Sequence, residues 1–132
     1  MPQYVLAVDL GGTKCAAAVV DRAGRIVRKR RVEVDVSSPS APISQIVQLA
    51  KDLAGDRNPK DAFAAMGIAV PGMVRANGTV WAPNLPGWQR MPLRDRVRRS
   101  LATPVVVESD RMLLSWPNAG EARHEGSRTP LF

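Results

Sequence analysis

The sequence predicts an α/β domain with a mixed sheet, in which three antiparallel strands are followed by parallel strands and helices. Short apolar runs recur at the length of strands, and only turn residues separate the first three of them. A segment of helical length precedes the fourth run, so the chain can cross over and return parallel to its first strand. With 132 residues, of which 45% are hydrophobic, the chain has the size and composition of one globular domain.

The first three runs are expected to form a meander. Residues 5–8 are continuously apolar, as in a strand covered on both faces, and a second buried strand follows the glycines up to residue 20. Asp21-Arg-Ala-Gly24 is a turn, because Gly24 can take the unusual backbone angles that it needs. The third strand is expected over Ile26–Val36, where valines alternate with acidic residues in the second half.

A helix and a parallel strand should follow. The helix has one apolar face, with Ser40 as a candidate N-terminal cap and Gly55 as a stop. This face comprises Ile43, Ile46, Val47, Ala50, Leu53 and Ala54. Residues 56–61 read as a polar connection, and residues 63–70 as a buried strand that ends at Pro71-Gly72.

The last predicted elements are a hairpin, a helix and a strand. Asn77-Gly78 is a favoured hairpin turn and joins residues 73–74 to residues 79–81. Residues 92–101 have the pattern of a short amphipathic helix, and residues 104–108 that of another buried strand. Because ligands of open α/β sheets gather at the carboxyl ends of the strands, polar residues at these ends are the candidate site.

The turn between the first two strands has the groups that suit a phosphate. Asp9 stands where the apolar run ends, and Gly11, Gly12, Thr13 and Lys14 follow it. Glycines let backbone N–H groups approach a ligand, with a hydroxyl and an ammonium beside them. Asp9 could hold Mg²⁺, directly or through water, because Mg²⁺ takes few carboxylates and keeps most of its waters. Taken alone, these residues would also fit an ordinary hairpin turn.

Four motifs together resemble those of the ROK family (repressors, open reading frames, kinases) of the actin-like ATPase superfamily. Residues 9–14, Asp-Leu-Gly-Gly-Thr-Lys, resemble its first phosphate motif, and Val70-Pro-Gly72 resembles its sugar-side loop. Residues 83–88, Pro-Asn-Leu-Pro-Gly-Trp, resemble its Asn-Leu-x-x-Trp loop, and residues 104–110 its Val-Glu-Asn-Asp segment. The resemblance covers residues 4–110 and implies the ribonuclease-H-like fold of that superfamily.

The resemblance implies phosphorylation of a hexose by ATP with Mg²⁺, as in glucokinases. The phosphates would lie on the glycine turn, which comprises Asp9, Gly11, Gly12, Thr13 and Lys14, and Asp9 would hold Mg²⁺ through water. Asp110 would be the catalytic base. The sugar would contact Gly72, Asn84, Glu108, Ser109 and Asp110, and Ser109 departs from the Asn of the family. Purely structural alternatives are a helix N-cap for Asp110 and a turn residue for Asn84.

Charge and cysteine content bear on whether the chain binds nucleic acid or zinc and whether it forms an internal disulfide. The net charge of +7 comes mainly from two arginine-rich segments, 22–31 and 90–99. These lack interleaved aromatic residues for base stacking, so solvated faces are favoured and a nucleic-acid partner is not expected. Cys15 is the single cysteine, which excludes an internal disulfide and the Cys-rich zinc site of the family, and it is expected in the core.

The expected compartment is the cytoplasm. No apolar run is long enough to span a membrane, and no leader pattern precedes the first strand, so no membrane partner is expected. Members of the ROK family are often homo-oligomers, and the sequence leaves the state of this chain open.

The resemblance stops after Asp110. The family continues Asp-Ala-Asn-Ala-Ala into a helix, whereas residues 111–118 include Pro117, which would break one. A shift of one base can convert the codons of residues 111–118 into Ala-Asn-Ala-Ala-Leu-Leu-Ala-Glu. We therefore expect residues 111–132, His124 included, to be an out-of-frame tail, with a genuinely divergent end as the alternative.

The family's second domain, with its second phosphate motif, adenosine pocket and zinc site, is expected to be missing. The chain alone is then expected to be an inactive, truncated kinase, because half a cleft cannot position ATP against a sugar. Two alternatives stay open: the sugar-sensing domain of a ROK-type transcriptional repressor, and a remnant without activity. The repressors have a helix-turn-helix ahead of the first strand. The sequence does not identify the sugar.

Overall fold

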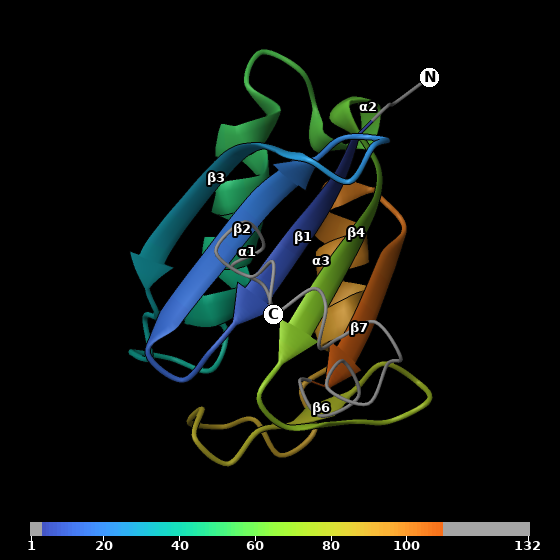
Figure 1. Ribbon diagram of the computed structural model, residues 1–132. Coiled ribbons are helices and arrows are strands. Elements are labelled where there is room, and N and C mark those ends of the chain that lie inside the picture. The colour runs from blue at the N-terminus through green and yellow to red at the C-terminus, as the bar shows by residue number, and fades with distance from the viewer. Residues whose placement is uncertain (1–3, 110–132) are drawn as a thin grey trace.

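The computed structural model describes residues 4–109, which form a five-stranded sheet, a separate two-stranded hairpin and three helices (Figure 1). In chain order the elements are β1 (Tyr4–Leu10), β2 (Lys14–Val20), β3 (Ile26–Glu33), α1 (Ala41–Ala54), α2 (Pro59–Ala62), β4 (Phe63–Val70), β5 (Met73–Val74), β6 (Val80–Trp81), α3 (Leu93–Leu101) and β7 (Val105–Ser109). The order across the large sheet is β3-β2-β1-β4-β7. The predicted α/β class is confirmed.

The sheet is mixed in the way that the sequence predicts. β1 pairs antiparallel with β2, and β2 pairs antiparallel with β3, so the first three strands form a meander. β4 pairs parallel with β1, and β7 pairs parallel with β4. The long connection through α1 and α2 makes the first crossover, and α3 lies in the second. The carboxyl ends of β1, β4 and β7 therefore lie at the same end of the sheet, which we call the carboxyl edge.

The core lies between the sheet and the helices α1 and α3, which cover the same face of the sheet (Figure 1). Alternate residues of each central strand point into it, including Leu6, Val8 and Leu10 of β1. Helix α1 presents Ile46, Leu49, Ala50 and other apolar residues to this face. Burying one such large side chain contributes about 1.5–3 kcal/mol, so this layer supplies most of the driving force for folding.

Three local predictions need correction. β3 ends at Glu33 and not at Val36, because Glu33 pairs with Lys14, the first residue of β2, and the partner beyond that pair is the glycine turn. The Gln45 side chain of α1 contacts the chain just after this point: its Nε2 donates to the Glu33 carbonyl at 2.8 Å, and the Asp35 N–H donates to its Oε1 at 2.7 Å. Ser40 stands at the N-cap position of α1 without a side-chain capping bond, because its backbone is already helical. The connection over residues 56–61 contains most of the short helix α2.

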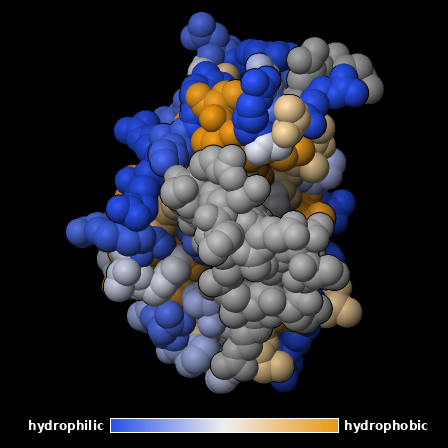
Figure 2. All heavy atoms as spheres, viewed as in Figure 1, coloured by the Kyte–Doolittle hydropathy of each residue, from blue (hydrophilic) through white to orange (hydrophobic). Residues whose placement is uncertain are grey.

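The two edges of the sheet differ in charge. β3 forms one edge and has four consecutive exposed cations, Arg28, Lys29, Arg30 and Arg31. Figure 2 shows a hydrophilic flank on this side of the molecule. β7 forms the other edge, where Val106 is 56% exposed. Arg30 also pairs with Asp52 at 3.2 Å, which ties the β3 edge to α1.

None of the helices in residues 4–109 is long and apolar enough to cross a membrane.

Candidate functional site

Two predicted site carboxylates lie in one row across the sheet. Asp9 on β1 pairs with Ala69 on β4, and Ala69 pairs with Glu108 on β7. Paired residues of neighbouring strands point to the same side, and here it is the side away from the helices, because the adjacent Val8 and Ile68 are buried in the core. Since neighbouring strands are about 4.8 Å apart, the two backbones are separated by about 10 Å.

The predicted glycine turn is formed between β1 and β2. The Gly11 N–H donates to the Lys14 carbonyl at 2.8 Å, which closes the turn, and the Val34 N–H donates to the Thr13 carbonyl at 2.9 Å. Gly12, Thr13 and Lys14 are exposed. The N–H of Gly11 is therefore used within the turn, and the outward-facing groups are those of residues 12–14.

Lys14 has a partner that the sequence analysis missed. Its Nζ lies 3.2 Å from Glu33 Oε1 at the end of β3, and both side chains are substantially exposed. Lys14 pairs with Glu33 in the register of β2 and β3, and this pairing sets the contact. An exposed ion pair of this kind stabilises little, so the ammonium can exchange Glu33 for another anion at small cost.

Asn84 lies directly against the glycine turn. A methyl group on Gly12 would come within 2.6 Å of Asn84 Nδ2, so a side chain at residue 12 would displace the amide. Residues 9–14 and residues 82–88 are far apart in the sequence, and this contact brings them together at the carboxyl edge of the sheet. The structure thus places two of the four predicted motifs side by side.

The loop that presents Asn84 is rigidly held by Trp88, which is 1% exposed. Its Nε1 donates to the Pro39 carbonyl at 2.7 Å, and its backbone oxygen accepts the Ala82 N–H at 2.8 Å. Gly87 has φ +81° and packs against the Pro39 side chain. The sequence motif of residues 83–88 did not reveal this anchor, because the contact joins residues 49 positions apart.

Gly72 is required by close backbone packing. A Cβ at this position would collide with the Trp81 carbonyl of β6, so only glycine fits between β4 and the small hairpin. This packing explains Gly72 without a ligand. Gly72 is partly buried, and it lies at the carboxyl end of β4, next to the strand that holds Glu108.

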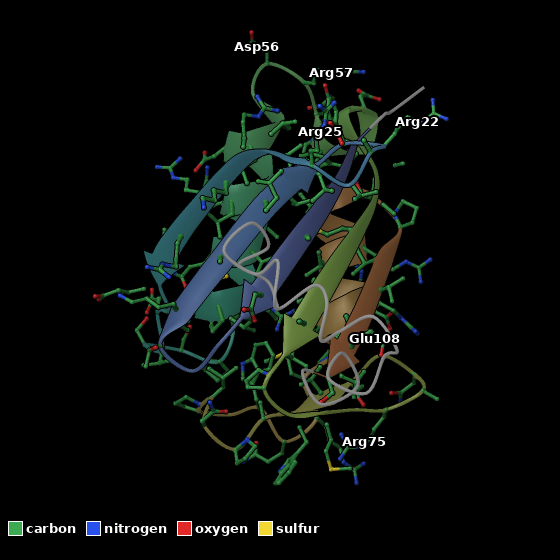
Figure 3. The ribbon with its side chains drawn as sticks, in the orientation of Figure 1. Arg22, Arg25, Asp56, Arg57, Arg75 and Glu108 are labelled. Atoms are coloured by element: carbon green, nitrogen blue, oxygen red, sulfur yellow. The ribbon has the colours of Figure 1, made fainter. Side chains whose placement is uncertain are left out.

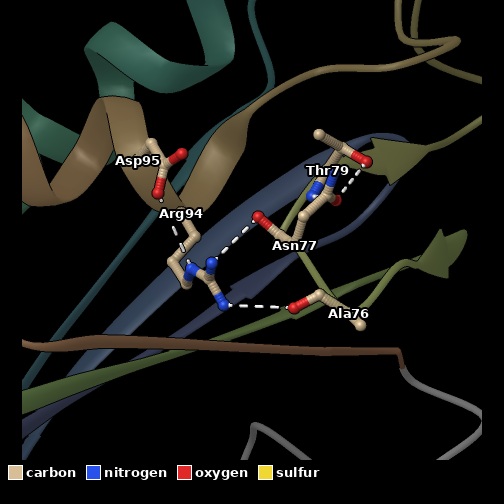
Figure 4. A network of polar contacts seen from close by, with 5 residues as sticks. All are labelled: Ala76, Asn77, Thr79, Arg94 and Asp95. Carbon is tan, nitrogen blue, oxygen red and sulfur yellow. Dashed lines mark hydrogen bonds and ion pairs between the residues drawn. The ribbon is translucent and has the colours of Figure 1, made fainter.

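Arg94 ties the β5–β6 hairpin to α3 (Figure 4). Its Nη2 donates to the Asn77 carbonyl at 2.9 Å, and its Nη1 donates to the Ala76 carbonyl at 3.5 Å. Gly78, with φ +85°, leaves room for this side chain, since a Cβ there would lie 2.7 Å from Arg94 Nε. The Nε is buried and lies 3.7 Å from Asp95 Oδ1, too far for a hydrogen bond.

A cavity of about 410 Å³ lies between this hairpin and β7. Its lining includes Arg75, Arg94, Glu108 and Ser109. Figure 3 shows Arg75 and Glu108 at the carboxyl edge, at the opposite end of the molecule from Arg22, Arg25, Asp56 and Arg57. Glu108 and Ser109 are therefore placed where the sequence predicts a ligand site.

Cys15 follows the turn and is fully buried, as expected of a core residue. Burial disfavours the thiolate, and the nearby Asp9 carboxylate adds to this, so the pKa of Cys15 is raised to about 12. The thiol is therefore protonated and unreactive at neutral pH.

Within residues 4–109 no three His, Cys, Asp or Glu side chains are grouped so as to hold a metal ion. Asp9, beside the glycine turn, fits Mg²⁺ all the same, because that ion commonly takes one or two carboxylates together with phosphate oxygens and water. The predicted base Asp110, the tail 111–132 and His124 lie outside the described residues.

Three comparisons with known proteins place the chain among relatives. Residues 5–129 match the model of the ROK family, a range that includes most of the segment 111–132. A glucokinase from Streptomyces coelicolor is 35% identical over 125 residues, which cover 93% of this chain and 37% of that protein.

Solved structures of ROK proteins also resemble this chain. A ROK family glucokinase from Streptomyces griseus, in complex with glucose and AMPPNP, is 34% identical with a TM-score of 0.75, over 91% of this chain and 36% of that one. A ROK family transcriptional regulator, a homolog of the E. coli MLC protein, is 16% identical with a TM-score of 0.67, over 81% of this chain and 28% of that one, which is a likeness of fold. The chain thus spans about a third of the length of its relatives.

Proposed function

The chain belongs to the ROK family, and from this premise we propose that it forms the N-terminal part of an ATP-dependent hexose kinase of the glucokinase type. The glucokinases from the two Streptomyces species support this proposal. The family-implied cofactors are ATP and Mg²⁺, and the substrate class is a hexose.

The contact between Gly12 and Asn84 is the main structural support. It joins a turn of the kind that suits phosphates to a loop with an amide that suits sugar hydroxyls, at the carboxyl edge where ligands of α/β sheets bind. In a kinase the phosphoryl donor and the accepting hydroxyl must meet in line, and turn and loop are adjacent here as that reaction requires.

Each predicted residue has a proposed role. ATP, with Mg²⁺ to offset its charge, would supply the phosphoryl group. Residues 12–14 would bind its phosphates, and Asp9 would orient waters of the metal ion. Asn84, Glu108 and Ser109 would hold the hexose, with Gly72 allowing the close packing beneath it. Asp110 would accept the proton of the attacking hydroxyl, as that oxygen bonds to phosphorus and the bond to the leaving nucleotide breaks.

A sugar titration tests the proposal without requiring catalysis. Glucose, mannose and N-acetylglucosamine are each added to the purified 132-residue chain, and binding is followed by tryptophan fluorescence, with Trp81 40% exposed beside Gly72. We expect saturable binding of at least one hexose, weakened by about tenfold in Asn84→Ala, because one or two hydrogen bonds are lost.

Asn58→Ala is the matched control, because Asn58 is exposed and its side chain caps no helix. It should leave the sugar affinity unchanged. A folded chain that binds none of these hexoses would contradict the proposal. The repressor alternative shares the sugar binding, and it would be favoured if the chain also bound duplex DNA specifically.

A further inference from the structure

A second polar groove lies between α1 and α3 on the helix side of the sheet, whereas Asp9 and Glu108 lie on its other side. It encloses about 390 Å³. Its polar lining comes from Ser40, which precedes α1, from Ser44 and Gln48 in the first two turns of α1, and from Arg96, Arg99 and Ser100 of α3. Ser44, Gln48, Arg96, Arg99 and Ser100 are exposed, so the groove opens on the outer side of the helix layer.

The spacing of these residues makes two facing rows. Along α1 and the residue before it, Ser40, Ser44 and Gln48 follow one another at intervals of four residues. On α3, Arg99 and Ser100 come three and four residues after Arg96. Residues at such spacings lie on one side of a helix. One helix therefore presents hydroxyls to the groove, together with the Gln48 side chain, whose Nε2 donates to Asp52 Oδ1 at 2.8 Å. The other helix presents two guanidinium groups.

The two guanidinium groups lack acidic partners within residues 4–109. The arginines that do form ion pairs there are Arg25 with Asp21, Arg30 with Asp52, and Arg94 with Asp95. The side chain of Arg96 makes one hydrogen-bond-type contact, from Nη1 to Met91 Sδ at 3.6 Å. No carboxylate lines the groove. Two neighbouring cations without a counter-charge attract an anion.

The Ser40 hydroxyl adds a donor that caps no helix within residues 4–109. Ser40 occupies the N-cap position, yet its backbone at φ −89° and ψ −9° prevents the usual cap, and no side-chain capping bond is formed. The hydroxyl that the sequence analysis assigned to a helix cap is thus one of the groups that line the groove.

We propose that this groove binds a small anion with a phosphate group. Guanidinium groups pair with phosphate oxygens through two parallel N–H bonds, and two such groups match a dianion. The hydroxyls of Ser40, Ser44 and Ser100 can donate to the remaining oxygens. The volume exceeds that of inorganic phosphate alone, so a small phosphorylated metabolite fits the same chemistry. This inference does not rest on the proposed kinase function.

Titration of the ¹⁵N-labelled 132-residue chain with inorganic phosphate tests the site, in the absence of sugar and nucleotide. We expect saturating shifts of the amide signals of Ser44, Arg96, Arg99 and Ser100, with sodium chloride at equal ionic strength causing no such shifts. Glucose 6-phosphate forms a second arm. Tighter binding of it would assign the rest of the groove to a phosphorylated metabolite, and equal binding would assign the site to the phosphate group alone.

A pair of double variants distinguishes a defined site from diffuse charge. Arg96→Gln/Arg99→Gln should weaken phosphate binding by about tenfold or more, because both charge-assisted partners are lost. Arg28→Gln/Arg98→Gln changes the net charge equally at exposed positions outside the groove and should leave the affinity unchanged. Equal losses in both variants, or shifts spread over the whole surface, would overturn the proposal.

Discussion

At the scale of single residues, the hydrogen of Gly12 makes room for the amide of Asn84. Gly12→Ala should push Asn84 from its place, because the new methyl carbon would come within 2.6 Å of Nδ2. We expect the affinity for the hexose to fall by about tenfold, equivalent to about 1.4 kcal/mol. Isothermal titration with the sugar measures it.

Gly67→Ala is the control for this change. Gly67 lies in β4, and a Cβ there would meet no atom within 4 Å. The same added methyl should therefore leave sugar binding intact. If both variants bind the sugar as the parent chain does, Asn84 is not held by the turn in the way that we infer.

Cys15 sets a pH dependence of stability. Its pKa is raised from 9.0 to about 12, chiefly by burial, so the folded chain keeps the proton at a pH where the unfolded chain releases it. The contribution is complete below pH 9 and is lost as the pH rises toward 12. Urea unfolding at pH 8 and pH 10 should show a larger decrease in the free energy of unfolding for the parent chain than for Cys15→Ala.

The comparison with Cys15→Ala isolates the contribution of the thiol, because the two chains differ only at this residue. The difference between the two chains in free energy of unfolding should change with pH by up to about 1.4 kcal/mol per pH unit. Identical pH profiles would mean that the thiol is not buried as the structure has it. Thiol reagents provide a second check, because they should label Cys15 only when the chain unfolds.

Residue-level chemistry was partly visible in the sequence. Gly12, Asn84 and Asp9 stand where the motifs predict, because turn glycines and strand-end carboxylates have strong local signatures. Ser40 failed as a cap because a residue type cannot reveal a backbone angle. The Lys14–Glu33 pair and the Trp88 anchor depend on register and on long-range packing, which no local pattern contains.

At the scale of elements, Arg94 is the main link between α3 and the hairpin turn. Arg94→Ala removes two donors and leaves the carbonyls of Ala76 and Asn77 without these partners. We expect a loss of about 1–3 kcal/mol in the free energy of unfolding, as for hydrogen bonds to a charged group. Urea denaturation gives this value, and amide exchange should accelerate at Gly78 and Val80.

Two further variants test this assignment. Arg98→Ala removes an exposed arginine of the same helix that lines neither cavity, and it should cost little. Arg94→Lys should not rescue the hairpin, because an ammonium cannot reproduce the planar fork that reaches two carbonyls. Full rescue by lysine would show that charge alone, and not this geometry, is needed.

The sequence predicts a helix or strand best where polar or turn-forming residues stand at both of its ends. β4 spans residues 63–70 as predicted, since a polar segment precedes it and Pro71-Gly72 follows. α3 begins one residue later than predicted, and β7 is shifted by one residue at both ends. The end of β3 could not be placed, because no breaker residue marks it: the strand ends where its partner β2 begins, at the pair of Glu33 with Lys14.

At the scale of the whole molecule, the 132-residue chain alone should show negligible ATP-dependent phosphorylation of glucose. It spans about a third of the length of its relatives, and a kinase needs a cleft that positions ATP against the sugar and excludes water, which we do not expect so short a chain to form alone. A coupled assay for ADP, with a complete glucokinase as the positive control, measures it. Glucose-dependent ADP formation that disappears in Asn84→Ala would refute this expectation.

The global fold was the most predictable property, because the strands and helices of the core have clear patterns and the helix before the fourth strand makes that strand parallel to the first. The sequence predicted which strand ends carry the residues of the candidate site, but it did not predict how these residues are arranged in space. The contact of Asn84 with Gly12, and the groove between α1 and α3, arise only when distant segments are packed together.

The four cations of the β3 edge have a consequence for the behaviour of the purified chain in solution. Like charges along an edge strand discourage another strand from pairing with its open side. Salt weakens this repulsion, since the Debye length falls from about 30 Å at 0.01 M to about 3 Å at 1 M. The chain should therefore stay dispersed longest in dilute buffer. Light scattering should therefore detect self-association as the ionic strength is raised. When Lys29 and Arg31 are replaced by uncharged residues, self-association should already occur at low salt.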